Sequence, residues 1–171
     1  MTLDELMLLL ESGDGVFDEP EIDGLSHALQ CGAILRDEHP DDPELAVAGL
    51  LHDIADIKYP NDHRDHAQVG ADLVAPLFGP RVAHLIGSHV AAKRYLVATD
   101  ETYRAQLSPR SVETLAMQGN DLDELAIARM AHDPDLPAIL TLRRADERAK
   151  DPHTKPSPLD SWRNLLEDCL L

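Results

Sequence analysis

Aromatic residues and cysteines are both scarce in this chain, which has 4% aromatic residues and two cysteines among 171 residues. The scarcity of aromatics, together with the lack of alternating β-branched stretches, argues against a sheet and favours an all-α fold. Cys31 and Cys169 are too few for a disulfide framework, although a single bond between them is an open alternative. With no signal peptide and no apolar run long enough to cross a bilayer, the sequence predicts a reduced, cytoplasmic protein.

Basic residues are also few, because 15 lysines and arginines stand against 32 acidic residues and give a formal net charge of −17. Such a charge repels nucleic-acid backbones and anionic membranes, and no basic stripe is visible that would overcome it. We therefore expect neither nucleic-acid nor membrane partners. The length and the hydrophobic content of 43% fit one globular domain spanning residues 1–171.

Helix caps and apolar periodicity predict a bundle of about eight to ten helices. The expected helices are Thr2–Ser12, Asp23–Leu35, Asp42–Ile57, Asp65–Phe78, Pro80–Leu96, Glu101–Gln106, Ser108–Gly119, Asp121–Ala131, Asp135–Lys150 and Pro158–Leu170. A bend is expected at Gly87, and Trp162 is expected to anchor the last helix by packing. The segment 151–158, which contains three prolines, is a candidate lid or extended tether.

A histidine and an aspartate, His52 and Asp53, interrupt the apolar helical run from Leu45 to Ile57. Burying an imidazole beside a carboxylate among leucines costs free energy unless both groups find a partner, and a metal ion is a good partner. A second pair, His132-Asp133, is followed at once by a proline and is interpreted as a solvated helix end.

Several other histidines lie within apolar helical patterns, whereas the rest lie in turns rich in proline and aspartate. The first group is His27, His52, His66, His84 and His89, and the second is His39, His63, His132 and His153. One histidine on an apolar face is usually an ordinary core residue, but several on separate helices favour a shared metal. Asp146 falls on the apolar stripe of its helix, where an unpaired carboxylate would be costly.

The order His27, His52-Asp53, His66, His89 and Asp146 resembles the HD-domain superfamily. Three stretches of sequence, at residues 89–96, 107–119 and 143–150, resemble more narrowly the phosphonate-degrading HD-domain oxygenases. These oxygenases are relatives of myo-inositol oxygenase and use a mixed-valent diiron centre. The likeness covers roughly residues 20–150. It implies an all-α HD-domain helical bundle with a buried dinuclear site, two iron ions in the Fe(II)/Fe(III) state, and O2 as co-substrate.

Carried over by position, the resemblance implies that Asp53 bridges the two irons. It implies that His27, His52 and Asp146 complete the coordination of one iron, and that His66 and His89 coordinate the other. His63 is the alternative to His66. His84 lies on a different face of its helix from His89 and is left out.

An anion pocket is expected beside these ligands. Lys93 follows His89 by four residues, so both side chains project from one face of a helix. Ser111, Thr114 and Gln118 form a polar stripe on a helix that begins at Ser108-Pro109. The stripe alone is also compatible with a solvated surface helix, but these four residues match the phosphonate-holding positions of the family.

The chain departs from the family pattern at two places. Asp56 stands where the family has the last histidine of His-Asp-Ile-Gly-His, and Phe17 stands where it has a tyrosine. The family's nearby glutamate is displaced, which leaves Glu19 and Glu21 as candidates. We expect the metal ligands and the anion pocket to be retained, while Asp56, Glu19 and Glu21 meet a cationic end of the substrate, such as an ammonium.

The sequence therefore predicts an oxygenase that uses O2 to cleave the C–P bond of a small α-hydroxyphosphonate, with Asp53, Lys93 and Asp56 as catalytic residues. One alternative is a metal-dependent HD phosphohydrolase that acts on a nucleotide or phosphomonoester. The other is a non-catalytic protein that binds a metal or a ligand.

Overall fold

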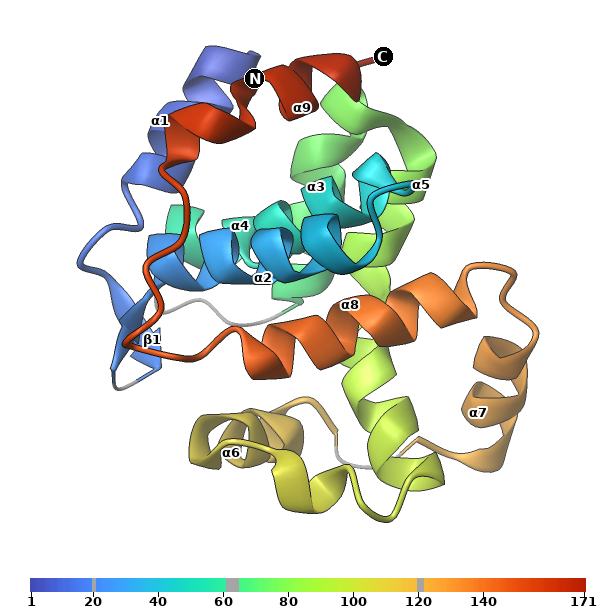
Figure 1. Cartoon of the computed structure of the whole chain (residues 1–171). Helices are drawn as coiled ribbons and strands as arrows, with labels where there is room; N and C mark the ends of the chain where they lie inside the picture. Colours follow the sequence, from blue (N-terminus) through green and yellow to red (C-terminus); the bar gives the residue numbers. More distant parts are fainter. Residues whose placement is uncertain (20, 61–64, 120–121) are drawn as a thin grey trace.

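Helices make up most of the chain in the computed structural model, which describes residues 1–19, 21–60, 65–119 and 122–171 (Figure 1). The elements are α1 (Leu3–Glu11), β1 (Phe17–Glu19), β2 (Ile22–Asp23), α2 (Gly24–Glu38), α3 (Pro43–Leu51), α4 (Ile54–Lys58), α5 (His66–Thr99), the 3-10 helix η1 (Arg104–Gln106), α6 (Pro109–Met117), α7 (Glu124–Ala131), α8 (Leu136–Arg148), the 3-10 helix η2 (Leu159–Trp162) and α9 (Arg163–Asp168). This architecture confirms the predicted all-α fold. Within these residues, no helix combines the length and the apolar composition that a membrane span requires.

Several helices begin where the sequence predicts, because a side chain caps the first free backbone N–H groups. Thr2 forms a capping box with Glu5 at the start of α1. Asp23 accepts from the backbone N–H of Ser26 at 2.9 Å at the start of α2. Ser108 caps α6 in the same way, by accepting from the backbone N–H of Ser111 at 3.0 Å.

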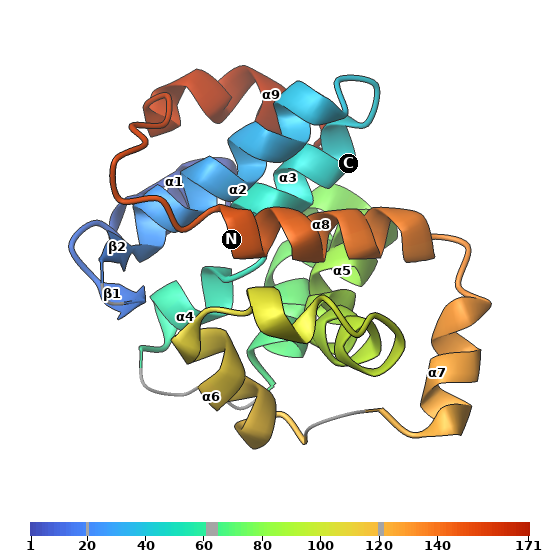
Figure 2. The same ribbon diagram turned by 60° about the horizontal axis from the view of Figure 1, so that its bottom comes forward.

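The short helix α3 lies at the centre of the fold and is buried from Leu45 to Leu51. It packs against α2, α5 and α8, which enclose it because nearly every side chain of α3 is apolar. Figures 1 and 2 both show α8 between the helices α1 and α9 on one side and α6 on the other. Trp162 is 1% exposed and packs into this core, as expected of the anchor of the last helix.

The predicted helix Asp42–Ile57 is wrong in one respect, because the chain breaks at His52 and Asp53 between α3 and α4. His52 still has helical backbone angles, but Asp53 has φ −104° and ψ 19° and starts the new helix. His52 Nδ1 is 2.8 Å from the carbonyl oxygen of Gly49, in the last turn of α3. Apolar periodicity did not reveal the break, because the residues on both sides of it are buried.

Other boundaries also differ from the prediction. The helix α5 is interrupted at Gly79, whose φ of 82° and ψ of −177° are not helical, so the predicted division between a helix that ends at Phe78 and one that begins at Pro80 is confirmed. No irregularity occurs at Gly87, so the bend expected there is wrong. Strands β1 and β2 form a small antiparallel pair that was not predicted, since two or three residues are too few to show an alternating pattern. Helix α7 begins after Asp123 instead of Asp121, and residue 121 lies outside the described residues. Cys31 and Cys169 are free thiols, so the alternative of a disulfide is wrong.

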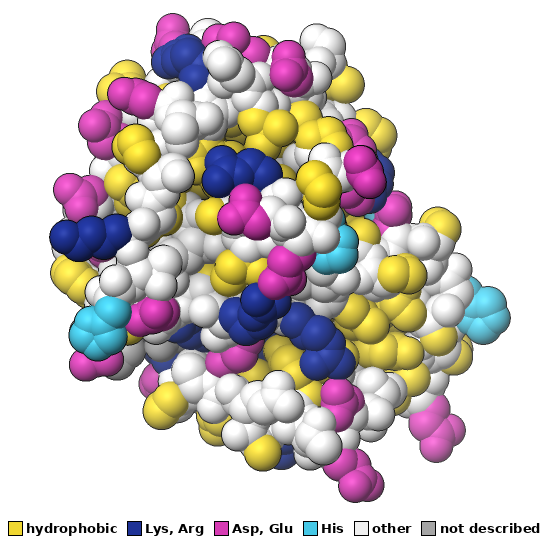
Figure 3. Space-filling view, in the orientation of Figure 1, with side chains coloured by type: hydrophobic (Ala, Val, Ile, Leu, Met, Phe, Trp, Pro, Cys, Tyr) yellow, Lys and Arg dark blue, Asp and Glu magenta, His cyan; other side chains and the backbone are white. Residues whose placement is uncertain are grey.

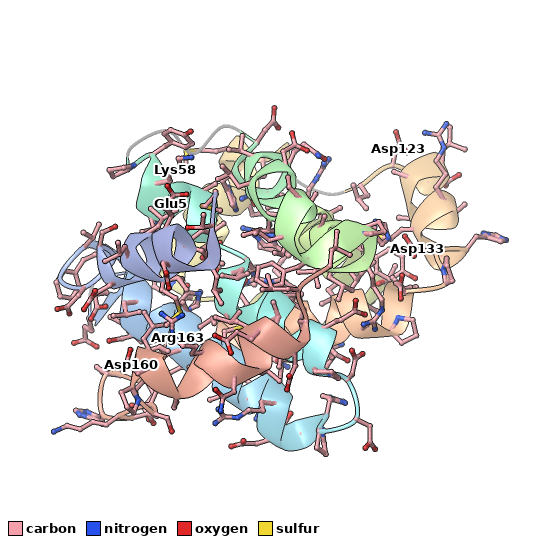
Figure 4. The ribbon with its side chains drawn as sticks, turned by 90° about the horizontal axis from the view of Figure 1, so that it is seen from above. Glu5, Lys58, Asp123, Asp133, Asp160 and Arg163 are labelled. Atoms are coloured by element: carbon pink, nitrogen blue, oxygen red, sulfur yellow. The ribbon has the colours of Figure 1, made fainter. Side chains whose placement is uncertain are left out.

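The buried residues form two hydrophobic clusters. The larger one joins α1, α2, α3, α5, α8 and α9, and the smaller one consists of Leu96, Val97, Tyr103 and Leu115. Leu115 belongs to α6, so α6 contributes its buried leucine to the smaller cluster. Helix α7 has no buried residue and stands at the edge of the molecule, between Asp123 and Asp133 in Figure 4.

Candidate metal centre and anion pocket

The predicted ligands come together from four parts of the fold. His27 is on α2, His52 and Asp53 lie at the break between α3 and α4, His66 and His89 are on α5, and Asp146 is on α8. The histidines and Asp146 are at most 8% exposed, whereas the side chain of Asp53 is 31% exposed. The break between α3 and α4 thus places one carboxylate at the boundary between the core and open space.

The two carboxylate oxygens of Asp53 face different histidines. Oδ2 lies 3.5 Å from His27 Nε2 and 3.2 Å from His52 Nε2. Oδ1 lies 3.8 Å from His66 Nε2 and 3.6 Å from His89 Nε2. On the first side, Asp146 Oδ1 lies 3.4 Å from His27 Nε2. This is the arrangement that a carboxylate bridging two cations requires.

The hydrogen bonds of the rings show which nitrogen is directed at the centre. Three rings place Nδ1 against a backbone carbonyl: His27 with Ala149 at 2.8 Å, His52 with Gly49 at 2.8 Å and His89 with Ile86 at 2.7 Å. A carbonyl oxygen only accepts, so Nδ1 carries the hydrogen and Nε2 of the neutral ring presents a lone pair. Yet Nε2 of His27 and Nε2 of His52 are 3.2 Å apart. Two facing lone pairs at that distance repel unless a proton or a metal cation lies between them.

The charges of the site point to the same requirement. Burial opposes a charged ring, yet the carboxylates of Asp146 and Asp53 raise the pKa of His27 to about 10. Burial and the neighbouring His66 lower the pKa of His89 to about 3, although Asp53 counteracts this. The buried carboxylates of Asp53 and Asp146 therefore need positive charge beside them, but the histidine rings are too close together for all of them to be protonated. Metal cations satisfy both demands at once.

The spacing of the donor atoms also fits metal ions. Ligand atoms about 2.1 Å from one ion lie roughly 3–4 Å from each other. The groups His27, His52 and Asp53, and Asp53, His66 and His89, each place their donor atoms within 4.8 Å of one another. Imidazoles with carboxylates suit iron, zinc and manganese, so the donor set alone does not select the metal.

The remaining histidines lie elsewhere. His84 is exposed and lies 2.8 Å from Asp133 on the surface, as expected of a residue outside the centre. His132 and His153 are exposed, in agreement with the sequence interpretation, while His39 is half-buried. His63, the alternative to His66, lies outside the described residues.

A cavity of about 1190 Å³ opens beside the centre, and its walls differ in charge. One wall carries Lys93, Ser111, Thr114 and Gln118, the residues expected to hold an anion. Lys93 is 3% exposed and its ammonium donates to the hydroxyl of Thr114 at 2.8 Å. Burial, with the charge of Arg143, lowers the pKa of Lys93 to about 8. The amide oxygen of Gln118 is buried and has no hydrogen-bond partner within the described part of the chain.

Two further residues that line the cavity, Arg143 and Lys150, were given no role from the sequence, and neither was Glu147, which contacts both of them from outside the cavity. Lys150 donates to the hydroxyl of Ser111 at 2.9 Å, and Arg143 forms ion pairs with Asp146 and Glu147. Their spacing along α8 places them beside Asp146, which is the signal that could have identified them. In Figure 3 basic side chains gather where α8 crosses this face, whereas acidic side chains are spread over the rest.

The lining of the cavity also includes Phe17 and Asp56, together with further apolar side chains. Phe17 is 60% exposed, and Asp56 is half-buried. Glu21 is exposed and is not among the residues that line the cavity, and the side chain of Glu19 lies outside the described part of the chain. Of the acidic residues expected at this end of the substrate, Asp56 is the one that the structure places at the cavity.

Residues 24–128 match the HD domain family. The chain belongs to the HD-domain family. Among its HD-domain relatives, the hydroxymethylphosphonate dioxygenase of Gimesia maris is 32% identical over 173 residues, covering 95% of this chain and 85% of the relative. The 1-hydroxy-2-(trimethylamino)ethylphosphonate dioxygenase (glycine-betaine-forming) of Leisingera caerulea is 33% identical over 132 residues, covering 72% of this chain and 67% of the relative. The uncharacterized protein L432 of Acanthamoeba polyphaga mimivirus is 32% identical, covering 85% of this chain and 71% of the relative.

Proposed function

We propose that this HD-domain protein is a diiron oxygenase that uses O2 to cleave the C–P bond of a small α-hydroxyphosphonate. The observation that carries the proposal is the buried ammonium of Lys93, one helical turn from His89 and bonded to Thr114. A cation at that place holds an anionic group directly beside the candidate metal ligands. Two relatives bear the names of phosphonate dioxygenases, which supports a phosphonate as that anion.

In this proposal His27, His52 and Asp146 would hold one iron, and His66 and His89 would hold the other. Asp53 would contribute to both, which the directions of its two carboxylate oxygens support. When bound, the irons would activate O2 and accept electrons from the substrate. A cytoplasmic location stays a prediction from the sequence.

The side chains of the protein position the substrate. Lys93 pairs with the phosphonate oxygens, while Ser111, Thr114 and Gln118 surround the same group from α6. This anchoring directs the hydroxyl-bearing carbon toward the space between the ligands, since Lys93 and His89 share one face of α5. The bound substrate also displaces water from a cavity that is partly apolar, which strengthens the charge interactions inside it.

The wall formed by Phe17 and Asp56 would receive the other end of the substrate. A carboxylate next to an aromatic ring favours a cationic group such as an ammonium. We therefore expect Asp56→Asn to raise the KM for a phosphonate with a cationic end by about threefold to tenfold, as loss of one charged contact does. The KM for hydroxymethylphosphonate, which has no such end, should stay within about twofold of its original value. Equal KM changes for both substrates would contradict this role.

The decisive experiment uses protein loaded with iron under argon. Hydroxymethylphosphonate or 1-hydroxy-2-(trimethylamino)ethylphosphonate is added, and O2 uptake and phosphate release are measured together. Oxidative cleavage of hydroxymethylphosphonate gives formate and phosphate, so one phosphate is expected for each O2 consumed. Mössbauer or EPR spectroscopy of the same samples tests whether two coupled irons are present.

The alternatives give different results in that experiment. A phosphohydrolase with the same ligands would release phosphate from a phosphomonoester under nitrogen, with no O2 consumed. A non-catalytic binding protein would bind phosphonate but release no phosphate with any metal. Zinc-loaded protein serves as the control, because zinc cannot change its oxidation state.

A further inference from the structure

Glu147 stands directly behind the anion-binding wall, with its side chain 10% exposed. One carboxylate oxygen, Oε1, accepts from the backbone N–H of Ser108 at 2.6 Å. The other, Oε2, accepts from the hydroxyl of Ser111 at 2.9 Å. A single carboxylate on α8 thus binds both the N-cap and the first turn of α6.

The contact with Glu147 decides how the hydroxyl of Ser111 is used. A hydroxyl has one hydrogen, and in this structure that of Ser111 is directed to Glu147. Its lone pairs are then available to Lys150, whose ammonium donates to Ser111 at 2.9 Å and to Ser108 at 3.2 Å. Glu147 therefore orients Ser111, and Ser111 in turn fixes the ammonium of Lys150 at the cavity wall.

Glu147 also connects this wall to the candidate metal centre. Its carboxylate forms an ion pair with the guanidinium of Arg143, and the same guanidinium pairs with Asp146. Arg143 is 4% exposed and its Nε donates to the hydroxyl of Tyr103 at 2.7 Å, so its position is fixed on several sides. The chain of contacts runs from Asp146 through Arg143 and Glu147 to α6.

Polar contacts carry much of the attachment of α6 to α8. Leu115 is the buried leucine of α6 and packs in the smaller cluster, against which Leu140 of α8 also packs. At the first turn of α6, Ser108 and Ser111 contact Glu147 and Lys150, and Ser111 also accepts from Arg143 at 3.4 Å. The position of the anion-binding side chains relative to the metal ligands thus depends on the carboxylate of Glu147.

We propose that Glu147 is the positioning residue that sets α6 and Lys150 in the geometry needed to bind the phosphonate group. This inference rests on the proposed function of the site. Glu147 does not line the cavity and acts through Ser111 and Lys150. Its charge is negative, so its direct effect on a bound anion is repulsive, whereas its positioning effect is favourable.

These two effects have opposite signs, which makes the proposal testable. If Glu147 contributed only charge, Glu147→Gln would tighten anion binding by removing a repulsion. If it positions Ser111 and Lys150, the same substitution weakens anion binding. A glutamine has one acceptor oxygen, so it cannot accept from Ser108 N–H and from the Ser111 hydroxyl through separate oxygens.

The experiment measures the binding of inorganic phosphate to iron-loaded protein under argon by calorimetry. Glu147→Gln is expected to weaken phosphate binding by about threefold to tenfold, which corresponds to one or two lost hydrogen bonds. Glu38→Gln is the matched control, because Glu38 also pairs with an arginine of α8 but lies on the surface. This control should bind phosphate as the unsubstituted protein does. Unchanged or tighter binding by Glu147→Gln overturns the proposal.

A double-mutant cycle separates positioning from a general loss of structure. Glu147 acts through the Ser111 hydroxyl, through Ser108 N–H and through its own ion pair with Lys150 at 3.6 Å. Because Ser111→Ala removes one of these shared contacts, the double variant is expected to lose less phosphate affinity than the product of the two single losses. If the double variant instead loses phosphate affinity by the full product of the two single losses, the proposal is overturned. Iron content and the pH profile of phosphate binding, measured for each variant, report whether the fold and centre persist. Failure of the unsubstituted protein to bind phosphate overturns both the anion pocket and this role, whereas binding without O2 uptake refutes the proposed function alone.

Discussion

The charge of Lys93 gives the sharpest prediction, because burial and the charge of Arg143 lower its pKa to about 8. Below that pH the side chain is an ammonium that binds an anion, and above it the side chain is a neutral amine. The free protein therefore loses the cation as the pH rises, and kcat/KM should fall by about tenfold between pH 7 and pH 9. KM should carry most of this change, because the cation acts in binding the phosphonate.

Substitutions of Lys93 test whether this residue causes the pH dependence. The side chain is 3% exposed, and a hydrogen bond to a charged group contributes about 1.5–3 kcal/mol, so Lys93→Met should lower kcat/KM at pH 7 by about 10- to 150-fold. Lys93→Met should also abolish the decline above pH 8, while Lys93→Arg should move it beyond the accessible range. Substrate ionisation is the same for every variant and cannot imitate this difference.

The assay is a series of initial rates of O2 uptake with hydroxymethylphosphonate from pH 6.5 to pH 9.5. Lys155→Met is the control, because Lys155 is an exposed lysine that does not line the cavity. The reasoning is refuted if Lys93→Met keeps the alkaline decline, or if the unsubstituted protein shows no decline over this range.

Three further predictions concern the metal and the fold. His89→Ala should remove bound iron, measured by metal analysis, whereas His84→Ala at an exposed position should leave the iron content unchanged; iron loss in both would contradict the ligand assignment. Arg81→Met should lower the Tm by about 2–4 °C in a thermal scan, because Arg81 joins three acidic side chains but is 32% exposed, which limits its contribution to about 1 kcal/mol. Gly32→Ala should destabilise the protein by about 1–3 kcal/mol in urea unfolding, since its Cβ would lie 2.7 Å from the ring of Trp162; an unchanged midpoint would show that this contact relaxes freely.

Much of the fold could be predicted from the sequence, because local signals determine it. Thr2, Asp23, Asp42 and Ser108 are caps that act within a few residues, and the helices begin next to them. The break at His52 and Asp53 could not be predicted in this way, because it depends on burial against other helices.

The candidate ligands could be identified because histidines within apolar patterns are unusual. Their grouping on the two sides of Asp53 came from the family resemblance alone, since the directions of the two Asp53 oxygens depend on how α2, α5 and α8 pack. The role of Glu147 was also hidden. Its neighbours Arg143 and Asp146 are local, but Ser108 and Ser111 are more than thirty residues away in the chain.

The division of the buried residues into two clusters has a consequence for how this protein can change over evolutionary time. The ligands from α2, α3 and α5 stand on the larger cluster, whereas the leucine that anchors α6 belongs to the smaller one. Substitutions around Leu115 can therefore reshape the proposed anion pocket without repacking the larger cluster behind the candidate metal ligands. A single scaffold can in this way yield descendants that keep the same candidate metal ligands and bind different small molecules beside them.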